Sequence, residues 1–329
     1  MKYSGIGGQA LIEGIMMKNK DNYAMAVRKP NGDIAVEKDT YVSLTEKVKF
    51  FSLPFVRGIF NFADSMILGM KTLGWSASFF EEYEDEEEPG KIEQWLIDKF
   101  GEKLEQYLMP IIMVFSMIMA VAIFMVLPLL IANVFRMFIK SETIMAIMEG
   151  FIRIGIFVAY IKLISRMEDI QRTFMYHGSE HKCINCLENG LILNVENVRK
   201  SSKEHKRCGT SFLLIVMTIS ILFFMVVRVE GVWLKIASRI ILIPVIAGIS
   251  YEVLRLAGRY DNKIMNLISI PGMWMQGLTT KEPDDPMIEV AIASVEAIFD
   301  WKEYLEETFP EMYPKGYFAE AEDRNDGNA

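Results

Sequence analysis

Long uninterrupted apolar blocks dominate this chain from about residue 109 onward. The first, Met109 to Phe135, holds no charged residue and exceeds the roughly 20 helical residues that cross a bilayer. Pro128 is expected to kink its far end. Three further spans are predicted at Ile144 to Ile164, Phe212 to Val227 and Val232 to Ser250. The pattern therefore predicts a mainly α, polytopic membrane protein with about four transmembrane helices.

Few charged residues interrupt these blocks. Glu149 and Arg153 stand one helical turn apart in the second span, where they can pair and reduce the cost of placing either in lipid. A structural ion pair is favoured over a functional pair. Lys235 and Arg239 lie near the start of the fourth span, and we expect them to extend outward to the interface.

The first residues follow a different pattern. Tyr23 to Arg28 and Asp33 to Glu37 flank Asn31-Gly32, which predicts a small N-terminal β-hairpin. Ahead of it, glycines surround Gln9 and Glu13. They are typical either of a flexible lead-in or of a backbone that approaches a ligand closely, and both interpretations stay open.

Three weaker apolar patterns predict amphipathic helices. Phe50 to Phe80 is periodic but broken by polar residues, which favours an interfacial helix. Ile264 to Gly277 is too short to cross and contains Pro271-Gly272, so an interfacial or re-entrant helix is expected. Met287 to Phe299 has apolar residues at helical spacing, with Asp284 or Asp285 as its cap.

These elements divide the chain into five segments. They are a cytoplasmic glycine-rich and hairpin segment (1–48), an amphipathic interfacial helix (49–80), an acidic linker with a short helix (81–108), a transmembrane bundle (109–281) that contains a cytoplasmic His/Cys segment (166–211), and a cytoplasmic amphipathic helix and tail (282–329).

Composition supports the membrane assignment. Hydrophobic residues make up 51% of the chain, above the usual share in soluble proteins, and the mean hydropathy is +0.21. The formal net charge of −8 is local, because the run Glu81 to Glu88 carries most of it. No basic surface for nucleic acid is indicated, and the lipid bilayer is the predicted partner.

Basic residues predict the orientation. They gather between the second and third spans and again after the fourth, whereas the other two connections are short and carry few. Because cytoplasmic loops are enriched in Lys and Arg, both termini and the His/Cys segment are expected in the cytoplasm.

The candidate chemistry lies in that segment, which holds all three histidines and all three cysteines of the chain. His177, Glu180 and His181 read H-x-x-E-H, so on a helix both imidazoles share a face and can bind one metal ion. The same order is the inverzincin signature, in which the glutamate activates water. Glu180 is therefore the candidate catalytic base, and a divalent metal ion, zinc by ligand type, is the expected cofactor.

The remaining ligands are open at this point. His205 and Cys208, three residues apart, are candidates, and Glu252 at the end of the fourth span occupies the place where an inverzincin's third ligand would lie. Lys182 and Arg207 are expected to steady an anionic intermediate or a lipid phosphate. Cys183 and Cys186 form a C-x-x-C, which alone is a weak signal.

Five blocks of this sequence resemble the bacterial DUF1385 family, the YqhQ-like proteins. They are Gly7 to Met17, Tyr176 to Lys182, Arg207 to Phe212, Ala247 to Glu252 and Leu278 to Pro283. The resemblance covers nearly the whole chain and implies a bacterial cell membrane protein with a suspected metal, but no reaction. Ser179 and Cys183 depart from the family pattern, and the second departure argues against the C-x-x-C as a ligand pair.

The expected function is a metal-dependent hydrolase at the cytoplasmic membrane face, acting on a peptide or lipid-linked substrate. Gln9 and Glu13 are expected to fold over its site. The alternative is a non-enzymatic membrane protein, either an ion-handling carrier or an assembly scaffold, with a structural metal or a headgroup-binding segment. Glu149 and Arg153 would favour transport if they faced a polar cavity.

Overall fold

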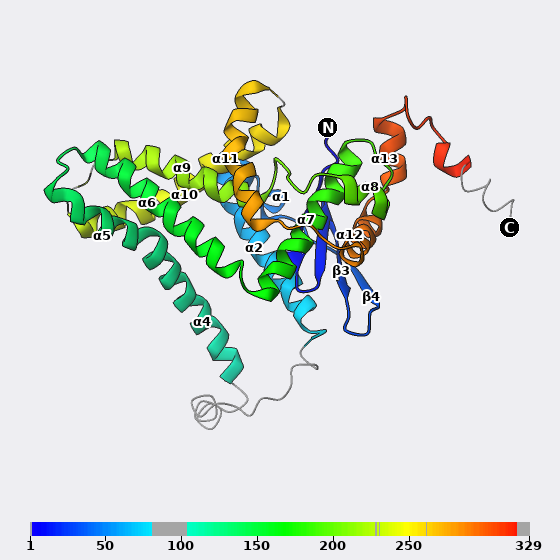
Figure 1. Ribbon diagram of the computed structural model, residues 1–329, viewed down its shortest axis with the longest axis horizontal. Coiled ribbons are helices and arrows are strands. Elements are labelled where there is room, and N and C mark those ends of the chain that lie inside the picture. The colour runs from blue at the N-terminus through cyan, green and yellow to red at the C-terminus, as the bar shows by residue number, and fades with distance from the viewer. Residues whose placement is uncertain (1, 81–103, 228, 230, 261, 321–329) are drawn as a thin grey trace. The chain divides into compact units, whose positions relative to one another are not determined.

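The computed structural model describes residues 2–80, 104–227, 229, 231–260 and 262–320 (Figure 1). They belong to two compact units: unit 1 is Met1–Phe80, Leu163–Ile215 and Ala247–Ala329, and unit 2 is Glu81–Lys162 and Val216–Ile246. Most of the predicted acidic linker and the end of the predicted tail fall on residues 81–103 and 321–329, outside the described residues.

Unit 1 contains an antiparallel sheet in the order β1-β2-β3-β4, which confirms the predicted β element and extends it. Its strands are β1 (Ile6–Leu11), β2 (Gly14–Asn19), β3 (Asn22–Arg28) and β4 (Ile34–Thr40). The glycine-rich lead-in is thus a second hairpin, whose turn holds Glu13 at a φ of 48°. In it Gly8 pairs with Met17 across β1 and β2.

The two faces of the sheet bury different helices. Ile15 and Met17 point to one face, where they pack with buried residues of α7 (Glu168–Glu188) and α12 (Asp285–Ile298). Met16 points to the other face and packs with Leu68 of α2 (Val56–Ala77). Strand alternation places every second side chain on each face, so both faces of this small sheet are covered.

Several other helical elements belong to unit 1. They are α1 (Leu44–Lys47), the 3₁₀ turn η1 (Lys49–Ser52), α8 (Val195–Lys200), α11 (Lys263–Thr279) and α13 (Trp301–Thr308). The apolar stretch around Pro271 is one continuous helix, α11. The predicted tail helix is α12, where Asp284 accepts a hydrogen bond from the Met287 N–H at 3.0 Å and so caps the first turn.

Unit 2 is helical in its described part. Its elements are α4 (Leu104–Val121), the π turn η4 (Ala122–Val126), α5 (Leu127–Val134), the 3₁₀ turn η5 (Phe135–Met137) and α6 (Glu142–Ile164), with parts of α9 (Gly209–Val226) and α10 (Val232–Arg259). The π turn ends two residues before Pro128. The proline ring and its missing N–H disturb the regular backbone hydrogen bonds of the helix there.

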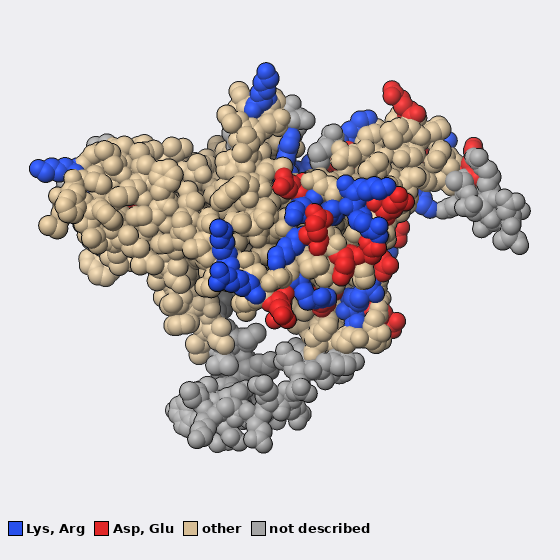
Figure 2. All heavy atoms as spheres, viewed as in Figure 1, with Lys and Arg blue, Asp and Glu red and all other residues tan. Residues whose placement is uncertain are grey.

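Four helical stretches of the described chain are long and apolar enough to cross a membrane, as the sequence predicts. They are Val114–Met137, Glu142–Ile164, Gly209–Val226 and Trp233–Gly258. On the face that Figure 2 shows, few Lys, Arg, Asp or Glu side chains lie over α4, α5 and α6, whereas many gather over unit 1. The chain is therefore a mainly α, membrane-associated protein with a small β element.

Candidate metal centre

Helix α7 carries the H-x-x-E-H motif in the middle of unit 1. Its imidazoles of His177 and His181 lie one turn apart with ring centroids 4.5 Å from each other. Acidic Glu168 and Asp169 occupy the first turn, where their negative charges interact favourably with the helix dipole. Gly190, at a φ of 77°, ends the helix in the left-handed conformation. The motif thus sits within regular helix, as its spacing predicts.

Main-chain carbonyls fix the orientation of both rings. His177 Nδ1 lies 2.9 Å from the carbonyl oxygen of Thr279, and His181 Nδ1 lies 2.7 Å from that of Lys203. A carbonyl can only accept, so each Nδ1 carries a proton, and the tautomer that binds a metal through Nε2 is the one these contacts select. Metal-binding histidines are commonly oriented in this way by an acceptor behind the ring.

Cys208 completes a group of three donors. Ligand atoms of His177, His181 and Cys208 all lie within 4.8 Å of one another, and His177 Nε2 is 3.2 Å from the Cys208 sulfur. The Thr210 N–H donates to the same sulfur at 3.4 Å, which helps to hold the side chain beside His177. Two imidazole nitrogens and one thiolate are donors that zinc accepts, and three protein ligands leave a fourth position for water or substrate. The residues fit a divalent metal.

Glu180 lies beside this group of donors and lines the same cavity. It is buried, and the Gly8 N–H of β1 donates to its carboxylate. Burial raises the pKa of Glu180, although the nearby His177 and the Gly8 N–H act against that shift. A cavity of about 990 Å³ is lined by Glu180 and the three donors, together with Gly5 and the β1 residues Ile6 to Ala10.

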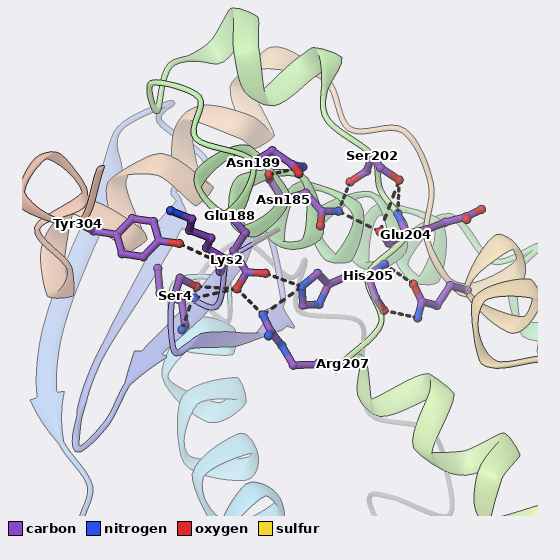
Figure 3. Close-up of polar contacts among 12 residues, drawn as sticks. Lys2, Ser4, Asn185, Glu188, Asn189, Ser202, Glu204, His205, Arg207 and Tyr304 are labelled. Carbon is purple, nitrogen blue, oxygen red and sulfur yellow. Dashed lines mark hydrogen bonds and ion pairs between the residues drawn. The ribbon is translucent and has the colours of Figure 1, made fainter. Parts of the chain in front are cut away.

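His205 lies in the cavity wall but is directed elsewhere. Its Nε2 is 3.6 Å from a Glu188 carboxylate oxygen, and Figure 3 shows the ring beside Glu188 and Arg207. Glu188 also accepts from the N–H and hydroxyl of Ser4 at 3.0 and 2.9 Å. Among the described residues, the group of donors within 4.8 Å does not include His205. Glu188, which His205 contacts, therefore holds the N-terminal segment in place through Ser4.

Glu252 and Glu13 have charged partners outside the donor group. Glu252 accepts from Arg57 Nε at 2.7 Å and from the Phe55 N–H at 3.2 Å. Glu13 forms an ion pair with Arg172, one turn ahead of the motif on α7. The first contact ties α10 to the start of α2, and the second ties the β1–β2 turn to α7.

The two candidate cationic side chains, Lys182 and Arg207, have partners within the protein. Lys182 is buried and donates to the carbonyls of Arg199 and Ser201 at 2.9 and 2.8 Å. Arg207 pairs with Glu188 and lies 4.3 Å from the ring centroid of Tyr3, at the cavity wall.

Of the other candidates, Gln9 alone faces the cavity. Gln9 is among the residues that line the cavity, and its side-chain amide lies against Gly69 of α2. Cys183 and Cys186 lie in the hydrophobic core, where burial raises the pKa of both thiols and disfavours thiolate ligands. All three cysteines are unpaired with one another.

Comparison with known proteins places the chain in a family. The family described as "Protein of unknown function (DUF1385)" matches residues 53–301. This chain belongs to the DUF1385 family. It is 35% identical over 295 residues to the uncharacterized protein YqhQ of Bacillus subtilis (strain 168), which covers 88% of this chain and 90% of that protein. No solved structure matches it.

Several groups that organise this DUF1385 site are main-chain atoms, which residue types alone do not reveal. They are the carbonyls of Thr279 and Lys203 and the N–H of Gly8. One clue in the sequence was the block Leu278 to Pro283, which resembles the family although its residue types suggest no chemical role of their own. Its closeness to α7 depends on Gly178, because a Cβ there would lie 2.0 Å from the Lys281 carbonyl oxygen.

Proposed function

We propose that this DUF1385 protein is a metal-dependent hydrolase whose site is formed by His177, His181 and Cys208. The observation that carries the proposal is the convergence of these three donors, with both rings held through Nδ1 so that Nε2 is left for a metal. Zinc is the expected ion, because it accepts imidazole and thiolate ligands together.

Each residue has a separate role in this proposal. His177, His181 and Cys208 would hold the ion, which would supply Lewis-acid chemistry for an acyl or phosphoryl oxygen and for water. Glu180 takes the proton from the attacking water, because its buried carboxylate lines the same cavity. The Gly8 N–H keeps that carboxylate in place. Gln9 lies on the wall where the substrate would bind.

The proposed location is the cytoplasmic face of the bacterial cell membrane, with multiple spans and both termini inside. Cys208 directly precedes the apolar helix Gly209–Val226, so one ligand stands at the end of a candidate span. The basic loops favour the cytoplasmic side for this segment. A peptide or lipid-linked compound is the substrate class that reaches a site next to a membrane.

Metal content tests the site. Protein purified without added metal is analysed for zinc and other transition metals, alongside His177→Ala/His181→Ala, Cys208→Ser and the control His205→Gln. We expect about one ion per chain in the unmutated protein. The double variant and Cys208→Ser should lose it, whereas His205→Gln should retain it. A metal-free unmutated protein, reconstitutable with no divalent ion, would refute the proposal.

Glu180→Gln separates catalysis from structure. Glutamine keeps an oxygen that can accept the Gly8 N–H but cannot take a proton, so the variant should bind the ion and lose hydrolysis of peptide or lipid-linked test substrates by at least about 100-fold. If the variant keeps its activity, Glu180 is not the base; if it loses the ion and stability together, the metal is structural and the non-enzymatic alternative gains.

A second candidate is a thiol hydrolase, and one contact favours it. His177 Nε2 lies 3.2 Å from the Cys208 sulfur while Thr279 orients the other ring nitrogen, the arrangement of a nucleophile, its base and an orienting group. Chelation distinguishes the two. A metal-free protein that still hydrolyses its substrate and is inactivated by alkylation of Cys208 supports the thiol mechanism.

A further inference from the structure

A second cluster of charged side chains lies in unit 2, independent of the metal centre. Glu149 and Arg153 of α6 and Arg239 of α10 are 5%, 7% and 6% exposed. Arg153 donates to Glu149 at 2.9 Å, as the sequence predicts, and Arg239 donates to the same carboxylate at 2.6 Å. Arg239 therefore points into the helices and not outward to the interface, as was expected from its position near the start of the span.

This cluster holds more positive than negative charge. Two guanidinium groups share the single carboxylate of Glu149, and guanidinium stays protonated in proteins. Arg153 Nε has no hydrogen-bond partner, and Arg239 Nη1 lies 2.6 Å from the carboxylate without forming an aligned hydrogen bond. The Phe224 ring lies 5.1 and 4.7 Å from the two guanidinium carbons and offsets only part of the excess.

A cavity opens beside Arg239. Its volume is about 740 Å³, within the usual range of ligand sites. Arg136, Lys235 and Arg239 contribute cations to its wall, and Glu142 and Glu149 contribute carboxylates. Among the described residues the wall thus carries one positive charge in excess, or two when Arg153 behind it is counted. The rest of the lining is mostly apolar and includes Leu129, Ala132, Met145, Phe224, Met225 and Val227, with Asn133 and Ser238 as further polar residues.

The charge and the lining indicate the kind of ligand. An uncompensated cation between apolar helices is costly, and a bound anion removes that cost. Arginine is suited to phosphate because its planar donors match the phosphate oxygens. The apolar part of the wall suits a hydrocarbon chain. We propose that this cavity binds the phosphate group of an anionic phospholipid through Arg239 and Lys235.

Free phosphate shares this chemistry, so the test uses both sources. The full chain, purified in detergent, is titrated with short-chain phosphatidylglycerol, short-chain phosphatidylcholine and inorganic phosphate, and bound ligand is counted by native mass spectrometry. We expect phosphatidylglycerol to bind roughly tenfold more tightly than the zwitterionic lipid, because the excess positive charge selects a net anion. Inorganic phosphate that binds as tightly as phosphatidylglycerol, or no preference between the two lipids, overturns the lipid assignment.

Variants locate the binding. Arg239→Gln should weaken phosphatidylglycerol binding at least about tenfold, and Lys235→Gln should weaken it several-fold. The control is Lys140→Gln, which removes the same charge from an exposed position outside the cavity wall and should change nothing. Lys235 forms an ion pair with Glu142 at the cavity wall. Lys235→Gln therefore still tests phospholipid binding if Arg239→Gln does not fold. Unchanged binding in a folded Arg239→Gln, or in Lys235→Gln when that variant alone is available, overturns the proposal.

Discussion

At the scale of single residues, Gly8 sets the distance between the sheet and Glu180. A Cβ at this position would lie 2.7 Å from the Met16 carbonyl oxygen and 3.0 Å from the Glu180 carboxyl carbon. The side chain of the catalytic candidate is buried, so it has little room to retreat. The flexible lead-in and the close approach were both open from sequence; the structure shows a strand that comes close to Glu180.

Gly8→Ala should therefore destabilise the protein by about 1–3 kcal/mol and reduce hydrolysis, because the added methyl group displaces the carboxylate. Thermal unfolding and activity are compared with Gly7→Ala, where a Cβ meets nothing within 4 Å. The neighbouring variant should behave like the unmutated protein. Equal behaviour of the two variants would show that the close approach has no consequence.

Glu188 makes a pH-dependent contribution to stability. Burial alone would raise the pKa of Glu188, but His205, Arg207 and the Ser4 N–H outweigh it and lower the pKa to about 2. A depressed folded pKa stabilises the fold above the unfolded value, near 4.5, and this contribution is lost as pH falls from there toward 2. Its size at neutral pH is on the order of 3 kcal/mol.

The stability gap between the unmutated protein and Glu188→Gln should thus be constant from pH 7 to about 5 and shrink in more acidic buffer. Thermal unfolding in detergent across this range measures it. Glu196→Gln is the control, since Glu196 pairs with Lys200 on the surface and exposed pairs contribute little. A gap that stays constant down to pH 3 would contradict the ionised, paired state of Glu188.

At the scale of elements, the sequence pattern was sufficient to predict those features that depend on a single helix or hairpin. The spacing of His177, Glu180 and His181 placed them on one helical face, and Asn31-Gly32 placed the β3–β4 turn. Glycine-rich β1 and β2 escaped prediction, because glycine has no side chain to reveal alternation and their strand pairing depends on contacts with α7 and α2.

The third ligand shows the same limit. His205, Cys208 and Glu252 were all compatible with the spacing, because sequence distance does not state where a loop side chain points. In the structure Cys208 approaches His177, while His205 and Glu252 face Glu188 and Arg57. The difference depends on ion pairs between distant segments, which a single sequence cannot indicate.

Helix α7 offers a test of how the site is assembled. Gly178 lets the segment after α11 pack against α7, where the Lys281 N–H donates to the Phe174 carbonyl at 2.9 Å and Thr279 binds His177. Gly178→Ala would place a methyl group 2.0 Å from the Lys281 carbonyl oxygen. We expect a loss of about 3 kcal/mol or more and a lower metal content, measured by unfolding and elemental analysis.

Gly277→Ala is the matched control for that variant. It lies exposed in α11, where a Cβ meets nothing within 4 Å, and alanine in a helix is favoured over glycine by roughly 0.5–1 kcal/mol. Its stability should stay equal or rise, and its metal content should not change. A Gly178→Ala protein with normal metal content would show that the His177 carbonyl contact does not require this packing.

At the scale of the whole molecule, hydropathy and charge carry most of the information. The four predicted spans correspond to the four apolar helical stretches, and their ends differ by at most eight residues. Direction across the membrane is a separate property, because helices of this composition insert either way and the flanking Lys and Arg decide. The metal proposal depends on it, since a site on the cytoplasmic side meets different substrates from one outside.

Cysteine labelling decides the orientation. Lys140 is exposed between the first two spans and Lys38 is exposed on β4, so Lys140→Cys and Lys38→Cys report on opposite sides of the proposed topology. Cys183 and Cys186 are buried in the core and give little background, and the unmutated protein serves as the control for Cys208 at the cavity wall. A membrane-impermeant maleimide should label Lys140→Cys in intact cells and Lys38→Cys only after permeabilisation, because positive loops stay inside. Labelling in the reverse order would place the metal centre outside the cytoplasm, and the search for its substrate would move there.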